Sequence, residues 1–224
     1  MSKQDRSNTT KKSTVYVALI TALAIIIGSV ILGLGGQTIP QEPTPEAAAP
    51  AVELPNAGIT ESNKASITFT TNQGEIVIET TPSLAPLTVN AMAALAQKNY
   101  FDNTICHRLT TEGIFVLQCG DPTGTGTGGP GFNIPDENLP QPIDNNYPAG
   151  TVAMANSGIP GTSGSQFFLV YQDTSLGPDY TIWGSITSGL DILQTIASAG
   201  VVDGGADGAP LTGVTIESTK VTIS

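Results

Sequence analysis

Short β-rich runs separated by glycine and proline residues dominate the chain from residue 65 to residue 224. The first two, ASITFTT at 65–71 and GEIVIETT at 74–81, alternate polar and apolar residues and predict a β-hairpin, with Gly74 free to adopt positive φ at the turn. Similar runs lie at 104–109, 114–120, 150–156, 165–171, 180–186 and 212–223. Such a succession of short strands favours a mainly β fold.

Only two stretches of this region show helical spacing. In the run 86–99, apolar residues recur at Val89, Met92, Ala93 and Ala96, and Pro86 suits the first turn of a helix. The second helical stretch is SGLDILQTIAS at 188–198. A strand-dominated order with two helices favours a closed antiparallel barrel capped by helices over an alternating βαβ sheet.

Residues 14–34 carry no charge and predict a membrane-spanning helix, because about 21 residues at a rise of about 1.5 Å cover about 31 Å, the thickness of a bilayer core. We interpret this segment as a retained anchor, since no convincing small-residue cleavage site follows it; a cleaved signal peptide is the alternative. The basic tail, residues 1–13, then stays in the cytoplasm, and the rest of the chain lies outside the cell membrane. Residues 35–64, rich in Pro, Ala and Glu, are typical of an extended tether.

The charge of the chain argues against nucleic acid as a partner. The whole chain has a formal net charge of -11, of which residues 1–13 contribute +3, so the remainder carries -14. Such an acidic surface repels phosphate backbones. Within 65–224 the only arginine, Arg108, follows the only histidine, His107, and the plain interpretation of this pair is two surface residues.

Three sequence blocks change that interpretation. They are ICHRL followed by IFVLQCGDPTGTGTGG, then TVAMANSGIPGTSGSQFFLVY, then SLGPDYTIWGSI. Together they closely resemble the cyclophilin family of peptidyl-prolyl cis/trans isomerases, and the resemblance covers essentially all of residues 65–224. It implies an eight-stranded antiparallel barrel with a helix over each end. It also implies isomerase activity on proline-containing polypeptides without a metal or other cofactor, and we expect a monomer.

The resemblance assigns roles to individual residues. Arg108 matches the catalytic arginine of the family. The family's substrate-binding positions fall on His107, Phe115, Val116, Gln118, Ala155, Asn156, Gln166, Phe168, Leu176 and Tyr180. Among these, Ala155 and Asn156 belong to the segment whose backbone groups hold the substrate chain.

This sequence departs from the best-known eukaryotic members at the rim of the expected pocket. Ser175 replaces the tryptophan that binds cyclosporin, Tyr180 replaces a histidine, and Val116 replaces a methionine. The stretch from Arg108 to Phe115 is two residues longer than in those members, and the loop after the MAN segment is one residue longer. We therefore expect weak cyclosporin binding and an altered substrate preference, with the arginine and the proline pocket retained.

The residue types suit the chemistry independently of the family. An X-Pro amide resists rotation because its nitrogen donates a lone pair into the carbonyl. A guanidinium directed at that nitrogen binds the lone pair better as the amide twists, and therefore favours the transition state. Phe115, Val116, Phe168 and Leu176 could line an apolar slot for the proline ring, and Gln118 could orient Arg108.

Two other functions stay open at this point. His107, Asp121 or Asp136, and Ser163 occur in the order of one class of serine protease, although the turn after the serine is not the expected one. A binding module that keeps the cyclophilin fold without catalysis is the second alternative.

The glycine-rich run 124–131 lacks the Lys-Ser or Lys-Thr ending of a phosphate-binding loop, and we interpret it as an ordinary loop beside the site.

The chain contains two cysteines, which flank Arg108. Cys106 and Cys119 could form a disulfide across adjacent strands in an oxidising compartment. Because cross-strand geometry is restrictive, two buried thiols are the alternative.

Overall fold

The computed structural model describes residues 53–224. The predicted basic tail at 1–13, the membrane-spanning segment at 14–34 and most of the tether at 35–64 lie outside the described residues. Among residues 53–224, neither helix has the length and apolar character needed to span a bilayer.

The described region contains ten strands and two helices. They are, in chain order, β1 (Ala65–Thr71), β2 (Gly74–Thr80), α1 (Pro86–Gln97), β3 (Thr104–Ile105), β4 (Arg108–Thr110), β5 (Val116–Cys119), β6 (Thr151–Met154), β7 (Phe167–Val170), β8 (Ile182–Ser188), α2 (Leu190–Ala199), β9 (Asp207–Gly208) and β10 (Thr215–Ile223). The predicted mainly β fold with two helices is therefore confirmed.

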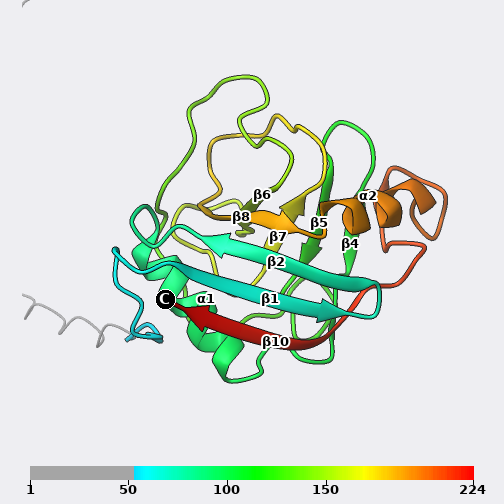
Figure 1. Cartoon of the computed structure of the whole chain (residues 1–224). Helices are drawn as coiled ribbons and strands as arrows, with labels where there is room; N and C mark the ends of the chain where they lie inside the picture. The colour runs from blue at the N-terminus through cyan, green and yellow to red at the C-terminus, as the bar shows by residue number, and fades with distance from the viewer. Residues whose placement is uncertain (1–52) are drawn as a thin grey trace, which may run out of the picture. The chain divides into compact units, whose positions relative to one another are not determined.

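All strands belong to one curled antiparallel sheet. The strand order is β3-β10-β1-β2-β8-β6-β7-β5-β4-β9, and β4 and β5 run at a steep angle to β1, β2 and β10 (Figure 1). This order corrects the predicted closed eight-stranded barrel, because β3 and β9 lie at the two ends of an open ladder. Each of these strands has only two residues, which is too short for an alternating sequence pattern to predict it.

The sheet buries a different apolar cluster on each face, because successive side chains of a strand point to opposite sides. On β5 and β7, Leu117 and Leu169 belong to the large inner core, which also contains Trp183. Val116 and Phe168, each one residue away, belong to a second cluster on the outer face. The outer cluster forms the apolar part of the candidate site.

Helix α1 covers the inner core, and a distant carboxylate caps its N-terminus. Val89 and the other predicted core positions of this helix are buried. The Glu137 carboxylate accepts hydrogen bonds from the backbone N–H groups of Leu87 at 3.1 Å and Thr88 at 2.8 Å. These contacts satisfy helix N–H groups that have no partner within the helix and place a negative charge at the positive end of its dipole.

The packed part of the chain starts before the expected domain boundary at residue 65. The backbone N–H of Ile59 donates to Asn90 Oδ1 at 2.9 Å, and Asn90 Nδ2 donates back to the Ile59 carbonyl at 2.8 Å. Ile59 itself is buried in the inner core. The last residues of the expected tether are therefore in contact with α1.

A disulfide joins Cys106 to Cys119, so the structure shows the paired alternative. It connects the segment just before β4 to the last residue of β5. Arg108 and Gln118, which pair across these two strands, lie beside the link. The disulfide therefore fixes one end of the hairpin that carries both residues.

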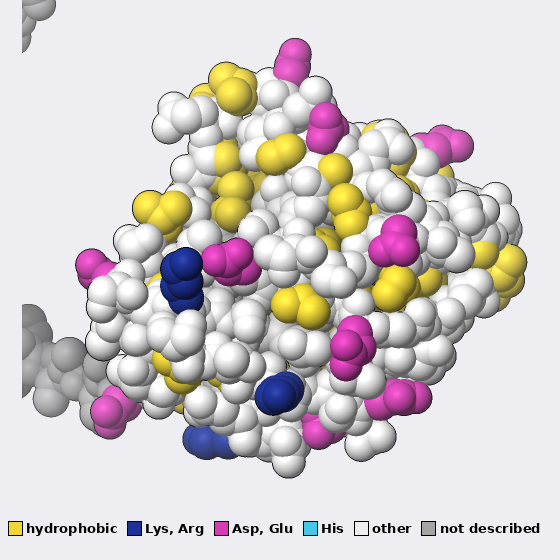
Figure 2. Space-filling view, in the orientation of Figure 1, with side chains coloured by type: hydrophobic (Ala, Val, Ile, Leu, Met, Phe, Trp, Pro, Cys, Tyr) yellow, Lys and Arg dark blue, Asp and Glu magenta, His cyan; other side chains and the backbone are white. Residues whose placement is uncertain are grey.

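The surface of the described region is strongly acidic. Figure 2 shows acidic side chains spread over the visible face, with few lysine or arginine side chains among them. Positive charge in this region comes from Lys64, Lys98, Arg108 and Lys220. Arg108 is therefore an isolated cation on an acidic domain.

Candidate active site

One row of residues crosses four adjacent strands on the outer face of the sheet. Arg108 on β4 pairs with Gln118 on β5, Gln118 pairs with Phe168 on β7, and Phe168 pairs with Ala153 on β6. Residues directly opposite each other on neighbouring strands share a face. The register therefore places the predicted arginine, glutamine and phenylalanine side by side, although they are distant in the sequence.

Hydrogen bonds hold the guanidinium group of Arg108 from both neighbouring strands. On one side, Nη1 donates to Gln118 Oε1 at 3.3 Å. On the other, Nε and Nη2 donate to the Asp207 carboxylate at 2.8 and 2.7 Å. The bond to Asp207 is the main cause that raises the pKa of Arg108. The arginine is therefore charged, restrained and still partly open to solvent.

A chain of amide hydrogen bonds continues from Gln118 to the glycine-rich loop. Gln118 Nε2 donates to Gln166 Oε1 at 2.8 Å. Gln166 Nε2 then donates to the carbonyls of Gly126 and Gly128 at 3.0 and 2.9 Å. The orientation of the Gln118 amide, and hence of its acceptor for Arg108, is fixed by this loop.

Asp121 in turn organises the loop. Its side chain is fully buried and accepts hydrogen bonds from the Thr123 N–H and hydroxyl and from the Gly126 and Gly128 N–H groups. Burial by itself would raise the pKa of Asp121, but the hydrogen bonds outweigh it and lower the pKa to about 2. Asp121 is thus a structural anion at the base of the loop.

Beside Arg108, the outer face carries a cluster of apolar and aromatic side chains. The ring centroids of Phe168 and Tyr180 are 5.5 Å apart, and the rings are close to perpendicular. Val116 is buried in the same cluster, and Leu176 and Ile114 pack against it. These residues form an apolar surface next to the guanidinium group, as a proline ring requires.

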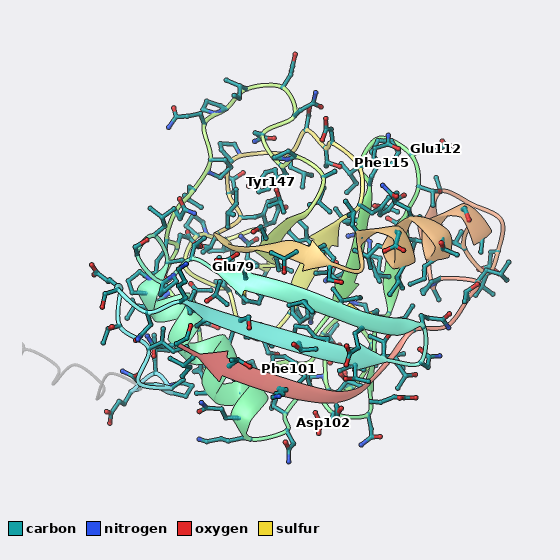
Figure 3. The ribbon with its side chains drawn as sticks, in the orientation of Figure 1. Glu79, Phe101, Asp102, Glu112, Phe115 and Tyr147 are labelled. Carbon is teal, nitrogen blue, oxygen red and sulfur yellow. A yellow bond between two sulfur atoms is a disulfide. The ribbon has the colours of Figure 1, made fainter. Side chains whose placement is uncertain are left out.

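Phe115 does not join this cluster. Its ring packs edge-on against Tyr171 at 6.0 Å, and it lines a different cavity that includes Gln194 of α2. The expected apolar slot is corrected accordingly: it lacks Phe115, and Ile114 packs there instead. Phe115 precedes β5 and packs against the inner core, whereas Ile114 and Val116 contact the outer cluster. Figure 3 shows Phe115 at the end of β5, near Glu112 of the preceding loop.

A cavity of about 830 Å³ adjoins the row of site residues. It is lined by Gln118, Ala155, Asn156 and Gln166 together with much of the glycine-rich loop. Asn156 Nδ2 donates to the Asp179 carbonyl at 2.8 Å, which fixes this side chain at the edge of the cavity. An extended peptide could therefore run along the segment that contains Ala155.

His107 lies apart from the outer row. Both imidazole nitrogens are buried and have no hydrogen-bond partner within residues 53–224. Burial lowers the pKa of His107, so the ring is held neutral beneath the glycine-rich loop. The ring lies against Gly126 of this loop, and the residue is partly exposed.

The residues of a serine protease are not assembled. Ser163 is 1% exposed, and its hydroxyl has no hydrogen-bond partner among the described residues. The carboxylate of Asp121 accepts hydrogen bonds from the glycine-rich loop, and that of Asp136 accepts one from the Gly161 N–H. No acid–base relay therefore connects His107 to the serine.

The sequence did not reveal two residues that complete the site. Tyr147 lies in the outer cluster, and its single hydroxyl proton is shared between the carbonyls of Gly177 and Tyr180, both at 3.2 Å. Burial raises its pKa to about 12. Asp207 is the second such residue. Neither belongs to an alternating run or to one of the three motif blocks, so only the fold brings them to the site.

Comparison with known proteins places this geometry in a family. Residues 66–221 match the model of the cyclophilin type peptidyl-prolyl cis-trans isomerase family. A probable peptidyl-prolyl cis-trans isomerase B of Mycobacterium tuberculosis is 46% identical over 191 residues, covering 79% of this chain and 61% of that protein. A peptidyl-prolyl cis-trans isomerase-like 1 of Emericella nidulans is 40% identical over 159 residues, covering 69% of this chain and 93% of that protein.

Solved structures agree with the sequence relatives. A cyclophilin type isomerase of Cryptosporidium parvum superposes with a TM-score of 0.62 at 30% identity, covering 71% of this chain and 98% of its own. The chain therefore belongs to the cyclophilin-type peptidyl-prolyl cis-trans isomerase family. It spans about three fifths of the length of the Mycobacterium tuberculosis relative.

The low pKa of Asp121 predicts a specific loss of stability in acid. A carboxylate with a pKa of about 2 in the folded state and an ordinary pKa in the unfolded state stabilises the fold above about pH 4, and this contribution disappears as the pH falls to about 2. We expect it to be about 2 kcal/mol. Asp121→Asn should lower the free energy of unfolding at pH 7, and the difference from wild type should shrink between pH 4 and pH 2 in urea titrations. A difference that is constant over this range would contradict the assignment.

Proposed function

We propose that residues 65–224 catalyse cis/trans isomerisation of Xaa-Pro peptide bonds, with Arg108 as the catalytic hydrogen-bond donor. The observation that carries the proposal is the row of paired residues in which the restrained Arg108 faces the same side of the sheet as Gln118 and Phe168, whose ring packs on Tyr180. A further support is the structure of the Cryptosporidium parvum relative obtained in the presence of the dipeptide Ala-Pro. Proline-containing polypeptides are the substrates that fit this site.

The reaction requires no covalent step. Rotation about the Xaa-Pro bond meets a barrier of about 20 kcal/mol, because the planar amide delocalises the nitrogen lone pair. At the twisted geometry the lone pair localises on nitrogen and becomes a hydrogen-bond acceptor. The Arg108 guanidinium group then makes a bond to the transition state that it cannot make to either planar ground state, and this difference lowers the barrier.

The remaining site residues hold the substrate on both sides of the rotating bond. The proline ring packs against Val116, Phe168 and Leu176, which removes apolar surface from water. The chain on the other side of the bond lies along Ala155 and the cavity beside Gln166. Because one side is held in the apolar cluster and the other along the strand edge, rotation is confined to the bond between them.

Replacing the arginine tests the mechanism. Arg108→Ala should lower kcat by about 10² to 10³, with KM changed less, because the lost bond forms only in the transition state. Arg108→Lys should recover only part of the rate. A lysine ammonium group lacks the planar fork of the guanidinium group, so it cannot bond to Gln118 and to the substrate at the same time. The measurement is a coupled isomerisation assay on a proline-containing tetrapeptide, with circular dichroism to verify folding.

The matched control is Lys220→Ala, which removes an exposed cation of β10 outside the site. It changes the net charge by the same amount and should keep the wild-type rate. A folded Arg108→Ala protein within about twofold of the wild-type rate would contradict the arginine mechanism. Wild-type protein without isomerase activity would contradict the proposed function and favour a binding module.

We further propose that the enzyme is anchored by residues 14–34 and acts as a monomer on folding proteins outside the cytoplasm. The support is the uncharged segment that follows the basic residues 1–13, since positive charge tends to stay on the cytoplasmic side. The disulfide between Cys106 and Cys119 suits an oxidising compartment.

Protease treatment of intact spheroplasts tests this orientation. We expect added protease to remove the isomerase domain and to leave an epitope placed before residue 14 protected. A protected domain with a digested N-terminal epitope would reverse the orientation. Release of the whole chain by a carbonate wash would contradict the anchor.

A further inference from the structure

The geometry points to Asp207 as a positioning residue that holds the catalytic guanidinium group of Arg108 in its working orientation. The inference rests on the proposed function, because it concerns the same arginine. Asp207 lies in β9, a two-residue strand at the end of the sheet, and is 99 residues away from Arg108 in the sequence.

The strand register explains how the two side chains meet. Asp207 pairs with Thr110 of β4, and Arg108 precedes Thr110 by two residues on the same strand. Residues two apart on a strand share a face, and a diagonal neighbour across the ladder is within reach of a long side chain. The arginine therefore reaches across to the carboxylate on the outer face of the sheet.

The contact occupies one edge of the guanidinium group and leaves another free. Asp207 accepts from Nε and Nη2 in a bidentate arrangement at 2.8 and 2.7 Å. Gln118 accepts from Nη1 at 3.3 Å. Of the five N–H groups of an arginine, these bonds use three, so one on Nη1 and one on Nη2 have no partner within residues 53–224. Those two are available to a prolyl nitrogen.

Gln118 alone would not fix this orientation. Its hydrogen bond is the longest of the three and holds the guanidinium group at a single atom, about which the plane can still rotate. Two parallel bonds to one carboxylate fix the plane as well as the position. Asp207 therefore sets the direction of the free N–H groups, and Gln118 supports it from the other strand.

The contact contributes little to folding. The side chains of Arg108 and Asp207 are 40% and 54% exposed, and exposed ion pairs add little stability because water screens them. The backbone around β9 is held by other bonds, including Thr111 N–H to the Ala206 carbonyl at 2.8 Å and Val202 N–H to the Ala209 carbonyl at 2.9 Å. Loss of the Asp207 carboxylate should therefore affect the rate rather than the fold.

The test compares Asp207→Ala and Asp207→Asn with Asp203→Asn. Asp203 is an exposed acid nearby in the chain, so this control makes the same charge change without touching the arginine. We expect both Asp207 variants to lose on the order of tenfold in kcat, with KM within about twofold, because a misdirected donor weakens only the transition-state bond. The control should keep the wild-type kcat, and melting temperatures should agree among all four proteins. If Asp207→Ala fails to fold, the isosteric Asp207→Asn decides.

A double-mutant cycle identifies the route of the effect. If Asp207 acts through Arg108, then Asp207→Ala should cause no further loss in an Arg108→Ala background. A kcat within twofold of wild type in both Asp207 variants would overturn the inference. So would an equal loss of kcat with and without Arg108.

A second readout does not depend on activity. Phenylglyoxal should label Arg108 faster in Asp207→Asn than in wild type, as measured by peptide mass spectrometry, because the guanidinium group has lost its bidentate partner. Equal labelling rates would overturn the positioning role. If wild-type protein shows no isomerase activity, the proposed function fails, while the labelling rates still decide whether Asp207 holds the arginine.

Discussion

The alternation of side chains along β4, β5, β7 and β6 is the constraint on which both the core and the site depend. One set of positions, which includes Leu117 and Phe167, fills the inner core. The other set, which includes Gln118 and Phe168, faces outward next to Arg108. A shift of register by one residue would bury the polar site and expose the core, so packing of the core specifies the site at the same time.

Two carboxylates with different surroundings hold the polar part of the site. Asp121 is fully buried and anchors the glycine-rich loop, whose carbonyls orient Gln166 and, through it, Gln118. Asp207 lies at the surface and contacts the guanidinium group of Arg108 directly. The arginine thus sits between a rigid loop and an edge strand. Electrostatic catalysis works best when the donor is oriented before the charge develops, and this arrangement supplies that orientation.

The sequence predicted the parts of this structure that depend on local pattern. The hairpin of β1 and β2, helix α1 and the strands that carry Arg108 and Phe168 follow from alternation, helical spacing and family motifs. The sequence did not predict that Phe115 packs against the inner core. The stretch between Arg108 and Phe115 is two residues longer than in the best-known relatives, so the motif does not determine which side of the sheet Phe115 faces. Nor did the sequence predict Asp207 or the cap that Glu137 provides, since both depend on contacts between distant segments. Such contacts are set by the packed fold and have no local pattern.

The preorganised orientation of the Arg108 guanidinium group can be tested by measuring the mobility of this side chain in the free protein. The full chain contains only Arg6 and Arg108, so nitrogen-15 NMR of the Nε–H groups gives two signals, and Arg108→Lys assigns them. We expect the Arg108 Nε–H to exchange slowly with water and to have an order parameter near that of rigid backbone, ~0.85, before any substrate is added. A rapidly exchanging, mobile Arg108 that becomes ordered only with a saturating proline peptide would contradict a preorganised guanidinium group.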